Sequence, residues 1–166
     1  MRLGKYFFLI VLLLCIFETT RLWFLAPARM ASHFNFQGNP DGFMPKLQFF
    51  VSQIQVALLV IGLGLLMQLV VLVTPARWIN LPNRDYWLVP EHHDALMENL
   101  SSFGFALFGG ILLVVQLGFE LSTYANLQAP VHFSAQIMLP AIAGFMIFSV
   151  VMLFLLTRSF RIPSES

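Results

Sequence analysis

Four stretches of the chain are apolar for about as many residues as a helix needs to cross a membrane. Crossing the hydrocarbon takes roughly 20 residues at about 1.5 Å each. None of the four shows the period-2 alternation of a barrel strand, so only α-helices can satisfy their backbone in lipid. The predicted spans cover residues 6–26, 47–73, 101–120 and 133–156. The pattern predicts an all-α, integral membrane four-helix bundle that forms a single domain over residues 1–166.

Positive charges are unevenly divided between the two sides of the predicted bundle. With four spans, both termini and the middle loop, residues 74–100, share one side. That side carries six Lys or Arg residues and the other carries three: Arg2, Lys5, Arg77, Arg84, Arg158 and Arg161 against Arg21, Arg29 and Lys46. Because cytoplasmic ends of membrane helices collect Lys and Arg, the asymmetry predicts that both termini are cytoplasmic. Residues 33–46 then face outward.

A stripe of small residues recurs every four positions on the third predicted span, at Ser102, Ala106 and Gly110. Small residues at this spacing let two helix backbones approach closely. We expect the stripe to serve packing within the chain rather than a dimer interface.

Composition narrows the classes of function. The chain has 58% hydrophobic and 10% charged residues, with a mean hydropathy of +0.81. Its net charge of +1 leaves no basic excess to neutralise phosphates, so nucleic acid is not an expected partner. The only cysteine, Cys15, can form neither an intramolecular disulfide nor a thiolate cage. Nucleophile elbows, Walker loops, dinucleotide fingerprints and zinc signatures are missing from the sequence, so we assign no catalytic residue, metal or cofactor.

The most chemically varied stretch, set between two apolar spans, is "HFNFQGNPDGFMPK", residues 33–46. Pro40, Asp41 and Gly42 predict a turn over residues 39–42, since Pro presets the backbone and Asp can bond its own backbone. That turn could bring His33, Asp41 and Lys46 together. With Asn35, these residues are the candidate binding residues of the outer loop. Two interpretations stay open. The first is a site for a polar or charged ligand, which includes a metal bound by His33 and Asp41 with His132 as a further candidate. The second is an ordered loop that only connects two helices.

This stretch resembles the signature of a bacterial membrane family called domain of unknown function 1648. The family pattern is roughly Pro-x-His-aromatic-Asn-x-x-Gly-x-x-Asp-Gly-aromatic, followed by Lys. The matching positions are His33, Phe34, Asn35, Gly38, Asp41, Gly42, Phe43 and Lys46. The chain departs from the pattern at Ala31, where the family usually has Pro, and at Pro45, where it often has Ser.

A second stretch, residues 81–100, is similar to a segment that members of this family carry before their third span. The matching positions are Pro82, Asn83, Asp85, Tyr86, Trp87, Leu88, Pro90 and Glu91. The resemblance implies a multi-pass protein of the bacterial inner membrane. It also relates the chain to the N-terminal part of sporulation-delay-type immunity proteins, which resist a secreted toxin and relay its presence to a repressor. Those proteins have further spans, so only an immunity-like role is carried over.

The middle loop itself predicts an interfacial helix that begins at Pro90 and Glu91, because Pro suits the first helical position and a carboxylate favours the helix N-terminus. Trp78, Tyr86 and Trp87 are expected to anchor the loop at the membrane surface. His92 and His93 point about 100° apart on a helix, so they cannot share one face. We expect both to face solvent.

Three ionisable residues fall in or beside the spans: Glu18, Arg21 and Glu120. Glu18 and Arg21 are three residues apart, and a charge in lipid needs a partner, so the spacing predicts an ion pair near the outer interface. Glu120, at the outer end of the third span, is expected to meet water or to join His33 and Lys46.

Three functional hypotheses follow. The first is a non-enzymatic bacterial inner-membrane protein, a binding, regulatory or immunity-like module whose ordered outer loop recognises a partner. Besides the lipid bilayer, that partner would be a membrane protein or a secreted peptide. The second is a small transporter or channel subunit, if Glu18, Arg21 and Glu120 line a wet cavity. The third is a membrane enzyme, if His33, Asp41 and Lys46 converge beside a lipid-accessible groove.

Overall fold

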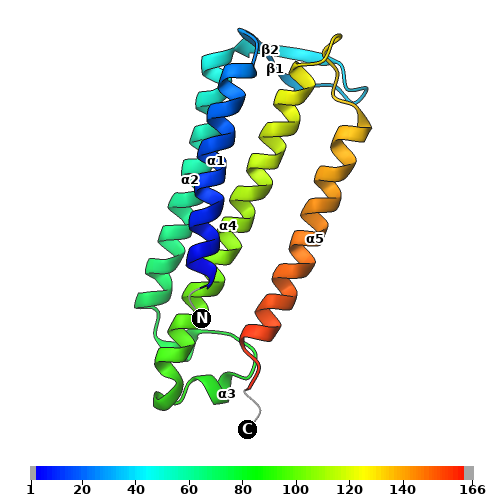
Figure 1. Ribbon diagram of the computed structural model, residues 1–166. Helices are drawn as coiled ribbons and strands as arrows, with labels where there is room; N and C mark the ends of the chain where they lie inside the picture. Colours follow the sequence, from blue (N-terminus) through cyan, green and yellow to red (C-terminus); the bar gives the residue numbers. More distant parts are fainter. Residues whose placement is uncertain (1–2, 163–166) are drawn as a thin grey trace.

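The computed structural model describes residues 3–162 and consists of four long helices with a short β-hairpin over one end (Figure 1). The long helices are α1 (Leu3–Leu25), α2 (Lys46–Val73), α4 (His93–Asn126) and α5 (Ala135–Ser159). The hairpin consists of β1 (Arg29–Phe34) and β2 (Pro40–Pro45), and joins α1 to α2. Between α2 and α4 lie the short helices η1 (Ala76–Trp78), α3 (Arg84–Trp87) and η2 (Pro90–His92). Because α1 begins and α5 ends at the end opposite the hairpin, we call the two ends the hairpin end and the terminal end (Figure 1).

All four long helices are long and apolar enough to cross a membrane, with mean hydropathies of 2.0 to 2.9 over their most apolar windows. Few of their side chains are buried, and the large exposed ones on α1, α2 and α5 are mostly Leu, Ile, Val and Phe. A surface of this kind is compatible with lipid and not with water. The predicted fold class, an all-α membrane protein with four potential spans, is confirmed. Among the described residues, the two strands of the hairpin are the only secondary structure that is not helical.

The central helix is α4, which packs against α1, α2 and α5. Its 34 residues give it a length of roughly 51 Å, more than the hydrocarbon thickness. The predicted helix that begins at Pro90 and Glu91 is present, as η2 followed directly by α4, but it does not end before the third span, because the chain runs as one helix from His93 through that whole region. No Pro or Gly occurs between His93 and Ser102 to interrupt the helix.

The small residues on α4 serve packing within the chain, as predicted. The backbone N–H of Gly4 on α1 donates to Ser102 Oγ at 3.1 Å, and this approach leaves no room for a side chain at Gly4. On another side of α4, the ring of Phe148 from α5 lies directly on Gly110. Small residues therefore let α4 contact two neighbours at once.

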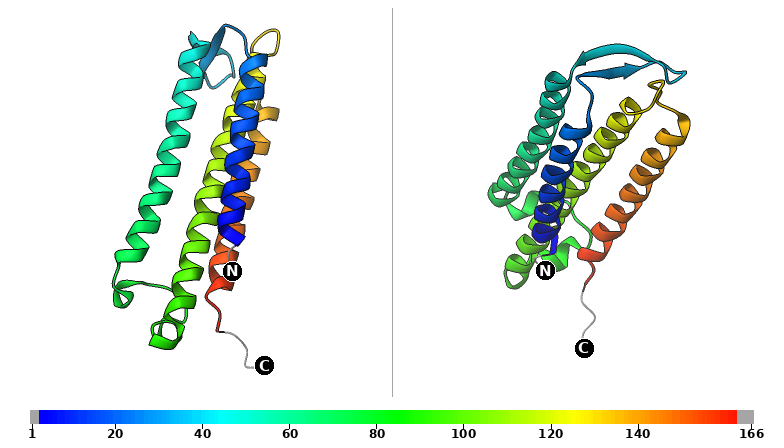
Figure 2. Two further views of the ribbon diagram at one scale, coloured as in Figure 1. Left: turned by 60° about the vertical axis from the view of Figure 1, so that its left-hand side comes forward. Right: turned by 45° about the horizontal axis from the view of Figure 1, so that its top comes forward.

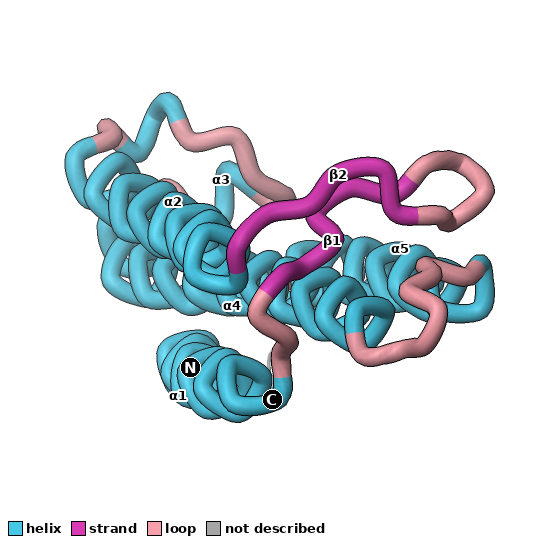
Figure 3. The backbone as a smooth tube through the Cα atoms, turned by 90° about the horizontal axis from the view of Figure 1, so that it is seen from above, coloured by secondary structure: helices cyan, strands magenta, loops and turns pink. Residues whose placement is uncertain are grey.

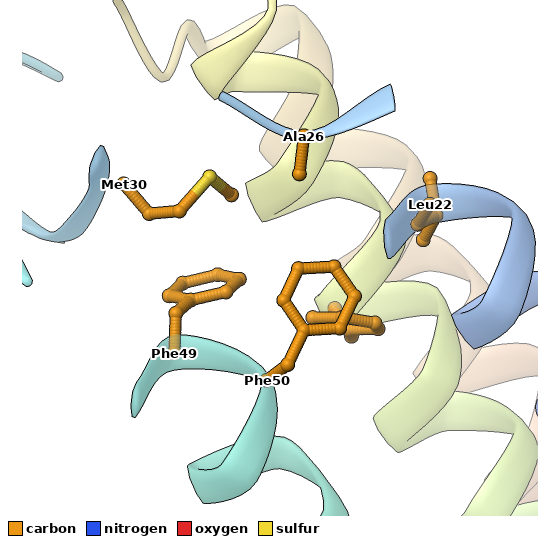
Figure 4. Close-up of a cluster of buried hydrophobic side chains, with 6 residues drawn as sticks. Leu22, Ala26, Met30, Phe49 and Phe50 are labelled. Carbon is orange, nitrogen blue, oxygen red and sulfur yellow. The ribbon is translucent and has the colours of Figure 1, made fainter. Parts of the chain in front are cut away.

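Three apolar clusters follow one another along the bundle. The hairpin-end cluster, shown in Figure 4, consists of Leu22, Ala26, Met30, Phe49, Phe50 and Phe119. The rings of Phe50 and Phe119 in this cluster pack edge to face, with 5.0 Å between their centroids. The central cluster consists of Val11, Cys15, Val60 and Leu112. The terminal-end cluster consists of Leu81, Trp87, Leu96 and Phe160, and connects the middle loop to the end of α5.

Candidate functional site at the hairpin end

The hairpin reverses direction earlier than the sequence suggests. Residues Pro40–Pro45 form β2, so the predicted turn over residues 39–42 is wrong. The reversal occurs between Asn35 and Asn39, where the Asn35 N–H donates to the Asn39 carbonyl oxygen at 2.9 Å. Asn35 Oδ1 accepts from the N–H groups of Gln37 and Asn39, both at 3.0 Å, and Gly38 has φ = +81°. An Asn side chain that accepts hydrogen bonds from the backbone of the turn and a Gly at positive φ both favour a turn here. Pro40 fits β2 because Pro is tolerated in an edge strand.

The hairpin is held on the bundle by Asn126, near the end of α4. Its Oδ1 accepts from the Ala31 N–H at 2.5 Å, and its Nδ2 donates to the Ala31 carbonyl oxygen at 3.0 Å. The same Nδ2 donates to the Ser122 carbonyl oxygen at 2.9 Å. The Asn126 side chain thus occupies the place that a third strand would take beside β1. Sequence analysis missed this residue, because nothing local links positions 31 and 126.

The tip of the hairpin is held at a second point, on the segment before α5. The Phe133 N–H donates to the Gly38 carbonyl oxygen at 2.8 Å, and the rings of Phe34 and Phe133 lie 5.3 Å apart. A side chain at Gly38 would collide with Phe133 and His132. Figures 2 and 3 show the result, with the hairpin crossing over the end of α4 towards α5.

A cavity of about 770 Å³ lies beneath the hairpin tip. The hairpin supplies most of its wall, and Gly118 and Ser122 from α4 complete it with Phe133 from the segment before α5. Its polar lining residues are Ser32, His33, Asn35, Gln37, Asp41 and Ser122, and its aromatic ones are Phe34, Phe36 and Phe133. A cavity of this size with a few polar groups among apolar ones is typical of ligand sites.

His33 and Asp41 form the charged part of this cavity. His33 Nδ1 lies 2.5 Å from Asp41 Oδ1, and the two side chains are 75% and 43% exposed. A carboxylate at Nδ1 fixes the orientation of the imidazole ring and favours a proton on that nitrogen. Nε2 is then the nitrogen left to accept a hydrogen bond from a ligand. The sequence prediction that these two residues lie together is confirmed.

Lys46 does not join them, so the predicted cluster of three residues is wrong in this part. Lys46 Nζ donates to the carbonyl oxygens of Trp23 and Ala26, at 3.0 and 3.2 Å, and lies 4.6 Å from the centre of the Trp23 ring. These carbonyls are at the C-terminal end of α1, where a cation is favourable. Lys46 begins α2 at the base of the hairpin, whereas His33 and Asp41 lie nearer its tip.

A second polar group lies between α1 and α4 below the hairpin. Arg21 Nε donates to Glu18 Oε2 at 2.6 Å, which confirms the predicted ion pair, and Arg21 Nη2 donates to Tyr124 Oη at 3.2 Å. Within residues 3–162, Glu120 forms no hydrogen bond or ion pair with His33 or Lys46. Instead, its Oε1 accepts from Gln116 Nε2 at 3.3 Å. Gln116 Oε1 in turn accepts from Thr19 Oγ1 at 3.3 Å.

The residues of the middle-loop motif lie at the terminal end and hold the end of α5. The Phe160 carbonyl oxygen accepts from Asn83 Nδ2 at 2.7 Å and from Trp87 Nε1 at 3.0 Å. Asn83 has φ = +55°, a backbone conformation that Asn tolerates better than most residues. The remaining polar and Pro positions of the motif are exposed: Pro82, Asp85, Pro90 and Glu91. This motif therefore fixes the middle loop to the last turn of α5.

His92 is only partly exposed, so the prediction that it faces solvent holds only in part. Its ring stacks on Tyr86 with 4.0 Å between the centroids, and its Nδ1 lies 2.7 Å from the Tyr86 carbonyl oxygen. The stacking is possible because α3 and η2 fold back on each other, which a continuous helix would prevent. His93 is exposed, as expected. Within residues 3–162, no three His, Cys, Asp or Glu side chains lie close enough to hold a metal ion.

Comparison with known proteins supports the family resemblance in the first part of the chain. The structure defines a four-helix membrane protein with a hairpin docked over one end. Residues 9–54 match the model of the family described as domain of unknown function (DUF1648). This segment covers most of α1, the whole hairpin and the first turns of α2, and so includes His33, Asp41 and Lys46. No curated protein and no solved structure matches the chain.

Proposed function

We propose that this chain is a non-enzymatic recognition module of the bacterial inner membrane. Its ligand is an exposed segment of a membrane protein or a secreted peptide, bound in the cavity beneath the hairpin tip. The observation that carries the proposal is the cavity of about 770 Å³ with the His33–Asp41 pair in its wall.

The way the hairpin is held supports a site of fixed shape. Asn126 holds β1, and the Gly38–Phe133 hydrogen bond holds the tip. A loop that only connected two helices would need neither attachment. Binding residues collect on loops that a rigid scaffold positions, since less ordering is then required when a ligand binds.

The chemistry of the lining suits a peptide that carries aromatic and polar groups. Phe34, Phe36 and Phe133 offer apolar and stacking surface, and Phe36 is fully exposed. Asn35 and Ser122 add hydrogen-bonding groups to the His33–Asp41 pair. A binding role of this kind agrees with an immunity-like module that recognises a secreted peptide.

The rival hypotheses have less support from the geometry. The enzyme hypothesis requires His33, Asp41 and Lys46 to converge, and Lys46 lies elsewhere. The transport hypothesis requires the polar groups around Glu18 and Glu120 to continue through the bundle. The apolar central cluster lies between these groups and the terminal end.

The orientation also forms part of the proposal. The hairpin end carries Arg21, Arg29 and Lys46, and the terminal end carries Lys5, Arg77, Arg84, Arg158 and Arg161; Arg2 lies outside the described residues. By the positive-inside rule, the terminal end is cytoplasmic and the cavity opens outside the cell.

The proposal is tested by replacing Phe36 with a photo-crosslinking amino acid in cells that produce this protein. Phe36 lines the cavity, whereas Phe24 is exposed near the end of α1 and does not. We expect a discrete protein or peptide adduct from position 36 and only lipid adducts from position 24. Identical adducts from the two positions, or neither a protein nor a peptide adduct from position 36, would contradict a recognition site beneath the hairpin.

A further inference from the structure

A second cavity, of about 390 Å³, lies between α1 and α2 within the predicted membrane region. We call it the lateral groove. The wall of α1 includes Leu12 and Thr19, the wall of α2 includes Gln53 and Ala57, and α4 contributes Leu112 and Gln116. Several of its lining side chains on α1 and α2 are exposed, so the groove is open to the surroundings of the bundle.

The groove follows α4, on which both α1 and α2 pack. Residues of two apolar clusters line it: Phe119 of the hairpin-end cluster, and Cys15 and Leu112 of the central cluster. Because exposed side chains of two apolar helices border the groove, its opening faces the hydrocarbon.

Polar groups gather at the part of the groove nearer the hairpin end. Gln116, only 7% exposed, is already bonded to Thr19 and Glu120. Gln53 is different, because within residues 3–162 its side-chain amide has no hydrogen-bond partner. An amide without a partner in hydrocarbon is costly, so Gln53 needs an acceptor that the chain itself does not supply.

The depth of Gln53 indicates where that acceptor lies. Gln53 follows Lys46, the first residue of α2, by seven positions, or roughly 10 Å along the helix axis. The whole of α2 is roughly 42 Å long, about the thickness of a bilayer with its headgroup regions, which leaves roughly 6 Å of headgroup region at each side. For α2 upright and centred in a bilayer of this thickness, Gln53 lies a few ångströms inside the hydrocarbon boundary. The ester carbonyls of phospholipids lie close to this level.

We propose that the lateral groove binds an acyl chain of a phospholipid from the leaflet at the hairpin end, with Gln53 donating a hydrogen bond to its ester carbonyl. The apolar walls around Leu12, Ala57 and Leu112 contact the chain, and the polar part of the groove faces the ester. The bound lipid satisfies the one unpartnered amide of the groove and fills a space that water would not favour.

The test uses two pairs of neighbouring positions on α2. Ala57→Phe fills the groove, and Val56→Phe is its control because Val56 is exposed and does not line the groove. Gln53→Leu removes the donor, and Gln55→Leu is its control on an exposed neighbour. Each full-length variant is reconstituted in vesicles of phosphatidylethanolamine and phosphatidylglycerol, then extracted in mild detergent. Native mass spectrometry measures the phospholipid that remains bound, and thermal unfolding reports the fold.

We expect wild type and both controls to retain a phospholipid, Ala57→Phe to retain none, and Gln53→Leu to retain several-fold less because one hydrogen bond is lost. Equal retention by Gln53→Leu and Gln55→Leu would overturn the assignment of the donor and with it the proposal. So would a folded Ala57→Phe variant that keeps the lipid, or a lipid-free wild type in which a second protein chain crosslinks to the groove. If Ala57→Phe unfolds, the pair at positions 53 and 55 decides.

Discussion

The side-chain amide of Asn126 pairs with both backbone polar groups of Ala31, 95 residues away in the sequence. Its Oδ1 accepts from the Ala31 N–H at 2.5 Å and its Nδ2 donates to the Ala31 carbonyl oxygen at 3.0 Å. Asn126 is 5% exposed and Ala31 is fully buried. The pair therefore fixes the hairpin to α4 in a place where neither group could turn to water instead.

Replacing Asn126 by Leu should release the hairpin from α4. The Ala31 N–H and carbonyl would be left buried without partners, so we expect a loss of about 2–4 kcal/mol in the free energy of unfolding. Thermal unfolding in detergent measures the lost stability, and faster hydrogen exchange at Ala31 reports the release of the hairpin. Gln128→Leu, at an exposed position just after α4, is the control. Equal stability of the two variants would contradict a clamp at Asn126.

The terminal end offers a matched pair of tryptophans. Trp87→Phe removes the Nε1 donor to the Phe160 carbonyl and shrinks a buried ring, so we expect a loss of about 1–3 kcal/mol in the free energy of unfolding. Hydrogen exchange should rise in the last turn of α5. Trp78→Phe should change neither quantity, since Trp78 is 71% exposed. If both variants behave alike, the middle loop does not hold α5 through Trp87.

Glu18 and Arg21 should act as one structural unit. We expect Glu18→Gln or Arg21→Gln alone to lower the thermal stability, because each leaves an unmatched charge near the membrane interface. The double variant should lose less than the sum of the two single losses. Arg21 also contacts Tyr124, so Tyr124→Phe separates that contribution. Strictly additive losses would mean that the two charges have independent roles.

The orientation of the bundle can be measured with cysteines at its two ends. In a Cys15→Ala background, a cysteine at Asn39 marks the hairpin and one at Asp85 marks the middle loop, and both positions are exposed. Asp85 is preferable to Asn83, whose side chain holds the Phe160 carbonyl. A membrane-impermeant thiol reagent should label Asn39→Cys in intact cells and Asp85→Cys only after permeabilisation. The reverse pattern would place the hairpin in the cytoplasm.

Much of the helical architecture could be predicted from the sequence, because long apolar stretches have few alternatives in lipid. The ends of α4 were harder to predict. Residues 93–100 are polar enough to suggest a separate surface helix, but Leu96 is buried against Trp87 and Phe160. That contact comes from the folded loop and the end of α5, which local sequence does not show.

The hairpin shows the same limit more clearly. The residues Pro40, Asp41 and Gly42 have turn chemistry, yet they lie in a strand. The turn forms at Gly38 instead, where the chain also bonds Phe133, and β1 bonds Asn126. Local propensity is weak enough for such distant contacts to override it. His33 and Asp41 could be predicted as neighbours because they lie close in sequence and face each other across the two strands.

The central claim is that the cavity beneath the hairpin recognises a partner, and its most direct measurement is adduct yield from the crosslinking residue at position 36. The yield is compared in wild type, His33→Ala, Asp41→Asn and Asn39→Ala, with thermal stability measured on the same samples. His33 and Asp41 are exposed enough that the fold should survive, while Asn39 does not line the cavity and is the control. The account predicts that His33→Ala and Asp41→Asn keep the wild-type unfolding temperature and lose most of the adduct, and that Asn39→Ala keeps both. Folded His33→Ala and Asp41→Asn proteins with a wild-type adduct yield would contradict it.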